Sequence, residues 1–402
     1  MSDNMTRKKD NEENNVDVNQ LELFSDKIAK DSKKKPRPKN IPAESKTKNT
    51  DASASAFGWR FQVIVGIVLS LYNIKELKSV EIEGETEDIE LRFYDRDPEY
   101  IQVKAVQSNP IDAKDDYKAA LAMNTLINTS NITTGKYSKL VYVANFMNPL
   151  GLSKAILNAF WLPRMDKPFI RSYNSLPDDA RNFVQGRIEL AKEQLAKGEY
   201  LNTTDYFDLS KLYLVTILVS SDDQDEQNYS VLEGVIGNLF GGLKLNLSQS
   251  KVHNIKSMLV DRYLANAGSK ESKEKHEKIT KGILVWRMIF EIIDEVPDYF
   301  YDDLPAGIQD ELEAYEDGFI KQQVEDIDVI NKIIAGLNAY AKGAFPKQRE
   351  VKKFIEDKWM KYTEIFPLDN DQSVQEYGIK MIMLRILNGK RVIEKVKERV
   401  NL

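Results

Sequence analysis

Hydrophobic and polar residues alternate along two short segments of the chain, residues 88–93 and 100–106. In an extended chain this period of two places apolar side chains on one face and polar side chains on the other. The sequence Asp-Arg-Asp-Pro at 95–98 has the composition of a turn, so the two segments are predicted to form an antiparallel hairpin. Folding about this turn is expected to bring Asp88 near Lys104 and Glu90 near Gln102.

Further elements surround the predicted hairpin. Residues 57–72 are apolar on nearly every side, which favours a buried helix, with a buried strand over 63–71 as the alternative. A strand at 79–83 precedes the hairpin, and a helix to about residue 129 and a strand at 139–144 follow it. Helices at 150–161 and 176–195 and a strand (or helix) at 213–219 complete this half. The pattern predicts an α/β fold with a mixed sheet flanked by helices.

The whole chain is predicted to have three parts: a tail, an α/β domain and a helical domain. Residues 1–56 are polar and poor in aromatics, and we predict a disordered tail. We expect an α/β domain at 57–225 and a mainly α-helical domain at 226–402 that serves regulation or assembly. Its predicted helices are 231–240, 252–265, 280–296, 308–319, 327–342, 347–366 and 374–400.

Composition restricts the chemistry. The chain has 402 residues, a net charge of -6, no cysteine and two histidines, His253 and His276. Disulfides and cysteine-based zinc sites are therefore excluded, and a serine–histidine triad is disfavoured because both histidines are far from the hairpin. No apolar run is long enough to span a bilayer and the N-terminus has no apolar segment, so we expect a cytoplasmic protein without membrane contact.

The polar face of the hairpin has residue types suited to hydrolysis of a phosphodiester. This reaction needs a divalent metal ion that polarises the phosphate and activates water. Asp88 offers a carboxylate, Gln102 an amide oxygen and Val103 a carbonyl, which suit Mg²⁺ or Mn²⁺. Lys104, two residues beyond Gln102 on the same face, is placed to reach water or phosphate.

Two further acids lie close by in the sequence. Glu90 is expected to be the additional metal ligand because the alternation aims it at the polar face, and Glu87 is the second choice. A solvated amphipathic hairpin without catalytic function explains the alternation equally well.

Three short motifs resemble one nuclease family: Gly58-Trp-Arg-Phe-Gln62, Glu87-Asp88-Ile89 and Ile101-Gln-Val-Lys104. Together with the element order, they resemble the PD-(D/E)XK (restriction-endonuclease-like) superfamily in its Gln-x-Lys variant. They are most similar to the double-stranded-DNA endonuclease domain of bacterial antiphage effectors. That domain occurs fused to SAVED sensors in CBASS systems and in the nuclease subunit of Lamassu-type complexes. The resemblance covers residues 57–144 and extends at most to 219.

The resemblance implies a metal-dependent DNA endonuclease that acts in antiphage defence. By position, Asp88 corresponds to the metal-binding aspartate, Gln102 to its fellow ligand, Lys104 to the catalytic lysine and Gln62 to the helix residue that reaches toward the metal. Gln102 departs from the Glu or Asp of many members, which lowers the negative charge of the site. Glu90 or Glu87 is expected to compensate.

The same resemblance suggests partners. The C-terminal half lacks SAVED-like motifs, which favours a Lamassu-like subunit acting with an SMC-like ATPase and an accessory protein, as a homo-oligomer when active. Two alternatives stay open at this stage: a non-catalytic adaptor with a nuclease-like fold, and a nuclease that acts on RNA.

Overall fold

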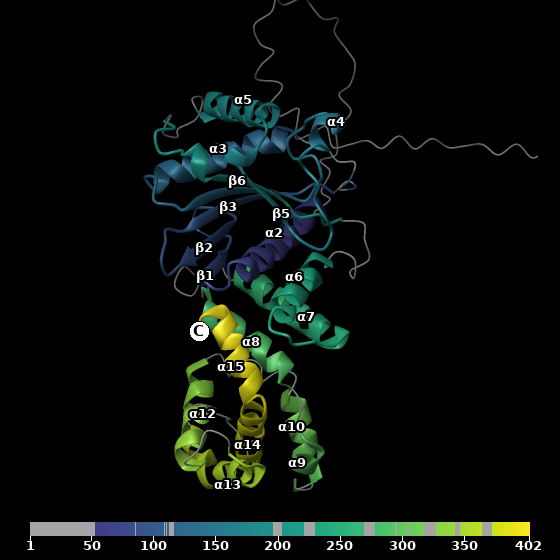
Figure 1. Ribbon diagram of the computed structural model, residues 1–402, viewed down its shortest axis with the longest axis vertical. Coiled ribbons are helices and arrows are strands. Elements are labelled where there is room, and N and C mark those ends of the chain that lie inside the picture. Colours follow the sequence, from purple (N-terminus) through teal and green to yellow (C-terminus); the bar gives the residue numbers. More distant parts are fainter. Residues whose placement is uncertain are drawn as a thin grey trace, which may run out of the picture. The chain divides into compact units, whose positions relative to one another are not determined.

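Seven strands form one mixed sheet in the order β5-β6-β4-β3-β2-β1-β7 in a computed structural model of the protein (Figure 1). β3, β4 and β6 are parallel to one another, whereas β1, β2 and β3 are joined by antiparallel pairing, as are β5 with β6 and β1 with β7. The predicted α/β class with a mixed sheet is therefore confirmed. The strands are β1 (Leu77–Ile82), β2 (Ile89–Phe93), β3 (Glu99–Lys104), β4 (Lys139–Ala144), β5 (Phe169–Ser172), β6 (Leu212–Thr216) and β7 (Ile279–Thr280).

The structure describes residues 53–402 except 85, 108, 110, 112–115, 196–202, 221–229, 269–277, 294–295, 303, 306, 317–326, 342–345 and 364–371. The first helix begins at Ser53, four residues before the predicted start of order. The rest of the predicted disordered tail, residues 1–52, lies outside the described residues. Asp51–Leu402 forms one compact unit.

Helices cover both faces of the sheet (Figure 1). On one face, α3 (Asp116–Ile132) and α5 (Asp178–Leu195) pack over a core that includes Tyr100, Tyr142 and Leu214. On the other face lies α2 (Ser53–Tyr72), covered in turn by α6 (Ser230–Gly241) and α7 (Gln249–Gly268). The predicted helix at 57–72 is thus confirmed, and the strand alternative is wrong. Its apolar residues are buried on almost every side, as the sequence pattern indicated.

Side chains alternate between the two cores along β3, as predicted. Ile101 and Val103 belong to the α2 core, whereas Tyr100 belongs to the α3 core. The register differs by two residues from one with Asp88 opposite Lys104, because Ile89 pairs with Ile101 and Glu90 with Tyr100. The expected proximity of Asp88 to Lys104 nevertheless holds, since their charges interact. A shift of two residues leaves every side chain on its face, so the alternation does not distinguish the two registers.

Helices make up most of the second half of the chain. The described ones are α8 (Lys281–Ile292), α9 (Asp298–Asp302), α10 (Ile308–Glu316), α12 (Ile327–Ala341), α13 (Gln348–Lys358), α14 (Gln372–Asn388) and α15 (Lys390–Val400). The predicted helix 374–400 is broken at Gly389, where a Cβ atom would collide with the side chain of Ile293. The close approach of Ile293 is a tertiary feature that the helical pattern of α14 and α15 does not reveal.

Other differences from the sequence prediction concern short elements. The predicted helix 150–161 is reduced to α4 (Lys154–Leu157), and β5, β7 and α9 were not predicted. The expected domain division at 225/226 falls within residues 221–229, outside the described residues, and stays a prediction. Elements from the two sides of this division contact each other, since β7 pairs with β1 and α6 packs on α2.

The expectation that no apolar run is long enough to span a bilayer is wrong by length and composition, because the described helical window Ser55–Tyr72 meets both criteria. More than half of it is buried inside the protein, between the sheet and α6 and α7. Such burial is consistent with the core helix of a soluble protein.

Candidate active site

The side chain of Asp88 is the centre of a polar cluster where β2 begins beside the end of β3. Asp88 Oδ2 accepts a hydrogen bond from the backbone N–H of Val103 (2.8 Å) and another from Gln102 Nε2. Both donors are next to Asp88 because Ile89 pairs with Ile101, which leaves Asp88 alongside Gln102 and Val103. The actual register therefore gives Asp88 a closer neighbour in Gln102 than the predicted one did.

Residues from the helix and from the β1–β2 connection complete the cluster. Gln62 of α2 donates a side-chain hydrogen bond to Asp88, so the cluster is reached from the helix on the other face of the sheet. Glu87 precedes Asp88 and its Oε1 accepts a hydrogen bond from Thr129 Oγ1 of α3 (2.6 Å). The two remaining oxygens, Gln62 Oε1 and Glu87 Oε2, are buried without a hydrogen-bond partner.

Burial controls the ionisation of the two adjacent acids. Burial raises the pKa of Glu87 to about 8, although the hydrogen bond from Thr129 opposes the rise. Burial also raises the pKa of Asp88, against the opposing effects of the Lys104 ammonium and the Val103 N–H. Two neighbouring carboxyls with raised pKa values in a mostly buried place are more common at functional sites than elsewhere.

Lys104 is the cation of the cluster. Burial lowers the pKa of its ammonium, while the Asp88 and Glu87 carboxyls oppose the change and Lys118 of α3 adds to it. A lysine held between two acids and away from bulk water is suited to contact a charged substrate group. Asp88, Gln102, Lys104 and Gln62, which the sequence singled out, are thus brought together.

Glu90 does not share the environment of Asp88. One carboxylate oxygen accepts hydrogen bonds from Thr86 N (3.2 Å) and Thr86 Oγ1 (2.8 Å), and the other accepts one from Arg92 Nη2 (2.8 Å). Both oxygens of Glu90 are therefore already occupied, and the site is better served by Glu87. The sequence argument ranked these two acids the other way, because strict alternation does not extend to Glu87, which lies before β2 begins.

The donor set has more amide and backbone oxygens than carboxylates. Among the described residues, no group of three or more His, Asp or Glu side chains is arranged to hold a metal ion. The sequence reasoning missed Thr129, which holds Glu87 from α3. No local pattern marks Thr129, because its role depends on the packing of α3 over the sheet.

His253 and two of the tryptophans lie outside this cluster. His253 lies exposed on α7, and His276 lies outside the described residues. Trp286 and Trp359 are buried in the core.

Fold and site together define an α/β protein whose mixed sheet has a buried acid–amide–lysine cluster at one strand end. Searches identify no relative: no protein-family model, no curated protein and no solved structure matches the chain.

Proposed function

We propose that this protein is a metal-dependent phosphodiesterase with a PD-(D/E)XK core that cuts double-stranded DNA at Asp88, Gln102 and Lys104. The observation that carries the proposal is the convergence of these three side chains where the start of β2 lies beside the end of β3. The element order α2-β1-β2-β3-α3-β4 agrees with the order expected from the family resemblance.

The residues present fit a hard divalent cation. Mg²⁺ and Mn²⁺ prefer oxygen ligands, and Mg²⁺ keeps several waters. Asp88 would hold the ion together with the unpaired buried oxygens Gln62 Oε1 and, once metal binding displaces the proton of its carboxyl, Glu87 Oε2. When bound, the cation supplies charge that polarises a phosphate oxygen and lowers the pKa of water.

The amide of Gln102 has a different orientation from the one that the resemblance implies. Its Nε2 donates to Asp88 and also lies 3.5 Å from the carbonyl oxygen of Val103. Serving as a ligand through its oxygen requires the amide group to turn by half a rotation about its last bond. Val103 then contributes its carbonyl in the same direction, whereas Glu90 is left out of the ligand set.

Lys104 is proposed to provide positive charge to the phosphate. Its side chain lies beside the Asp88 and Glu87 carboxyls, and as an ammonium it presents positive charge to the phosphate as negative charge develops there. Asp88 keeps this ammonium in place electrostatically. Removing the ammonium should therefore remove cleavage without removing the fold.

The decisive experiment compares Lys104→Ala with Lys78→Ala, an exposed lysine on neighbouring β1. With Mg²⁺ or Mn²⁺ present, Lys104→Ala should lower the rate of plasmid cleavage by at least about a hundredfold, a loss of ~3 kcal/mol in transition-state stabilisation. Lys78→Ala should cleave like the wild type. Cleavage by Lys104→Ala at the wild-type rate would show that the assigned site is wrong. Incubating the same samples with RNA decides between the two polymers.

A second candidate, a non-catalytic adaptor with a nuclease-like fold, is favoured by one observation. Asp88 Oδ2 accepts hydrogen bonds from both Val103 and Gln102, so this oxygen has protein partners in the absence of a metal ion. The adaptor predicts no Mg²⁺-dependent cleavage in any oligomeric state, with or without partners. A Mg²⁺ titration of cleavage and of thermal stability distinguishes the two.

The wider role rests on the family resemblance alone. We infer an antiphage effector of the Lamassu type that acts in the cytoplasm as a homo-oligomer, with an SMC-like ATPase and an accessory subunit. Co-purification with the products of neighbouring genes tests this. An SMC-like ATPase among them supports the inference, and its absence contradicts it.

A further inference from the structure

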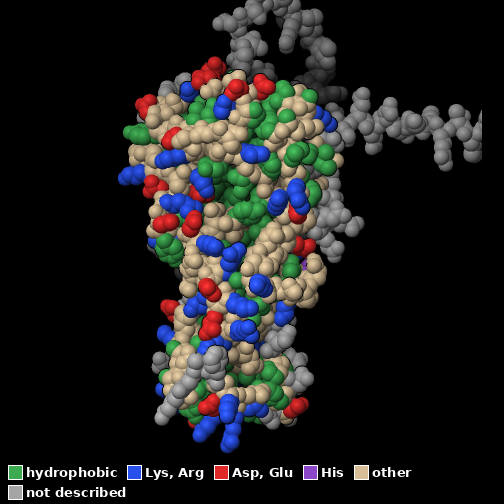
Figure 2. All heavy atoms as spheres, viewed as in Figure 1, with side chains coloured by type: hydrophobic (Ala, Val, Ile, Leu, Met, Phe, Trp, Pro, Cys, Tyr) green, Lys and Arg blue, Asp and Glu red, His purple; other side chains and the backbone are tan. Residues whose placement is uncertain are grey.

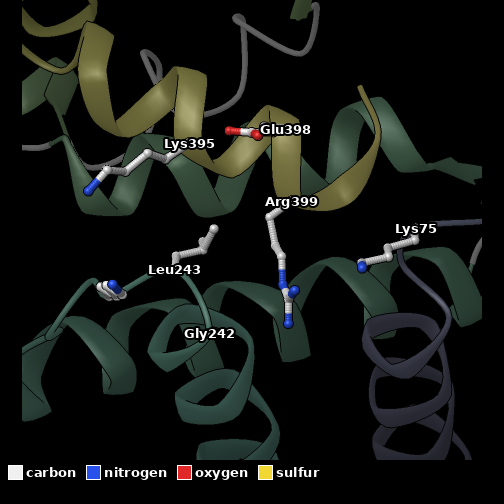
Figure 3. Close-up of a pocket in the computed structure, with 7 residues that line it drawn as sticks. Lys75, Gly242, Leu243, Lys395, Glu398 and Arg399 are labelled. Atoms are coloured by element: carbon white, nitrogen blue, oxygen red, sulfur yellow. The ribbon is translucent and has the colours of Figure 1, made fainter.

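A pocket lies far from Asp88, where three segments distant in the sequence meet (Figure 3). Its volume is about 370 Å³. The walls are the turn after α2, the turn between α6 and α7, and the last turns of α15. A volume of this size accommodates a nucleotide-sized ligand.

Cationic side chains dominate the lining. Lys75, Lys244, Lys395 and Arg399 line the pocket against a single carboxylate, Glu398. Within the described part of the chain, none of the four cations has an ion pair with a carboxylate. This excess of positive charge contrasts with the whole chain, whose net charge is -6. Figure 2 shows Lys and Arg side chains gathered over this part of the molecule.

Two of the four cations, Arg399 and Lys75, extend toward each other, whereas Lys395 extends away from them (Figure 3). In Figure 3, Arg399 extends from α15 into the gap between the helices, and Lys75 points toward it from the turn after α2. The guanidinium lies against the backbone of Gly242, so close that a Cβ atom at that position would be 2.9 Å from Arg399 Nη2. A side chain at position 242 would therefore displace Arg399, and glycine keeps the place for it.

The two walls of the pocket are held together from inside. Lys281, at the start of α8, is only 1% exposed. Its Nζ donates to the carbonyl oxygen of Lys75 (2.8 Å) and to that of Asn401 (3.0 Å), two residues beyond Arg399. This buried ammonium fixes the spacing between Lys75 and the end of α15. It also adds positive charge behind the pocket, so the site is preorganised for an anion.

The pocket is distinct from the proposed active site. Lys75 precedes β1, whose first residue Leu77 pairs with Phe93, whereas Asp88 adjoins the other end, where Ile82 pairs with Ile89. A strand of this length separates the two places by roughly 20 Å. A ligand here would not touch Asp88.

We propose that this pocket binds a small polyphosphate, either inorganic or the phosphate chain of a nucleotide. Several cations without an ion pair around one open pocket match a compact polyanion, because each phosphate accepts charge-assisted hydrogen bonds from Lys and Arg. A nucleic-acid backbone would instead require a basic stripe that follows the strand. The bound anion contacts both α15 and the turn after α2. The helix α2 also contributes Gln62 to the proposed active site.

Titration calorimetry of tripolyphosphate with the full-length protein, at about 0.15 M salt, tests the proposal. Arg399→Ala and Lys75→Gln should each weaken binding by about tenfold, equivalent to ~1.4 kcal/mol. Arg391→Ala is the matched control, since it removes an exposed cation of the same helix outside the pocket. It should leave the affinity unchanged. Melting temperatures verify that all variants fold.

The arms of the experiment separate the ligand sources. ATP binding more tightly than tripolyphosphate identifies a nucleotide, and equal binding identifies the phosphate chain alone; both support the pocket. Absence of tripolyphosphate binding to the wild type, or equal loss of affinity in Arg391→Ala and Arg399→Ala, overturns it. The proposal is also overturned if a short DNA duplex binds to the wild type and loses affinity in Arg399→Ala, whereas tripolyphosphate does not bind. Since the readout is binding, the result is independent of whether the protein cleaves DNA.

Discussion

Replacing Glu87 by glutamine should change how the stability of the protein depends on pH. Glu87 is buried, and its pKa rises from the ordinary 4.5 to about 8. At neutral pH the folded protein therefore keeps the carboxyl protonated, whereas the unfolded chain ionises it. The folded state binds more protons between these two pKa values, so the free energy of unfolding falls as the pH rises through this range.

The size of this effect follows from the two pKa values. The contribution of Glu87 to the free energy of unfolding decreases by about 3 kcal/mol between about pH 5 and about pH 8. Glu87→Gln cannot ionise, so the variant lacks this decrease. The glutamine keeps an oxygen for Thr129 Oγ1 but adds a buried N–H group, which has a cost of about 1–3 kcal/mol at every pH. The difference in slope, not the stability at one pH, is therefore the informative quantity.

Urea unfolding followed by tryptophan fluorescence at several pH values measures this difference. The stability of Glu87→Gln relative to wild type should rise by about 3 kcal/mol from the acid to the alkaline end of the range. Glu189→Gln, an exposed acid on α5, is the control and should show no such rise. A constant difference between Glu87→Gln and wild type would refute the protonated, buried state of Glu87.

Three further predictions concern packing, strand ends and metal. Gly66→Ala should destabilise by about 1–3 kcal/mol in urea unfolding, because its Cβ would collide with the buried Ile82 side chain. Gly58→Ala, in the same helix with nothing near it, should stabilise by up to about 1 kcal/mol. Asn145→Ala should cost about 2–4 kcal/mol in the same assay, since its side chain makes three hydrogen bonds to the chain after β3 and β6. Saturating Mg²⁺ should raise the melting temperature of the wild type but not of Asp88→Asn; an equal rise in both would place the metal elsewhere.

Several features of the site were predictable from the sequence because they depend on local patterns. The alternation along residues 100–106 correctly separated Ile101 and Val103 from Gln102 and Lys104. The element order around the hairpin is also as predicted. These features follow from side-chain periodicity, which each segment expresses by itself.

The choice between neighbouring acids could not be made in this way. Glu87 and Glu90 both lie within two residues of Asp88 in the sequence. Their fates differ because Arg92 and Thr86 engage Glu90, whereas Thr129 of a distant helix engages Glu87. Only contacts between elements distinguish them.

By itself, the sequence determined the elements around the hairpin, from α2 to β4, and which residues of the hairpin share a face. The tertiary structure decided the register, in which Asp88 lies beside Gln102 and Val103 and is reached by Gln62. It also decided the meeting of Lys75 with Arg399, more than three hundred residues apart. Periodicity is a local property of the chain, but register and long-range contacts depend on how all the elements pack at once, which no single segment encodes.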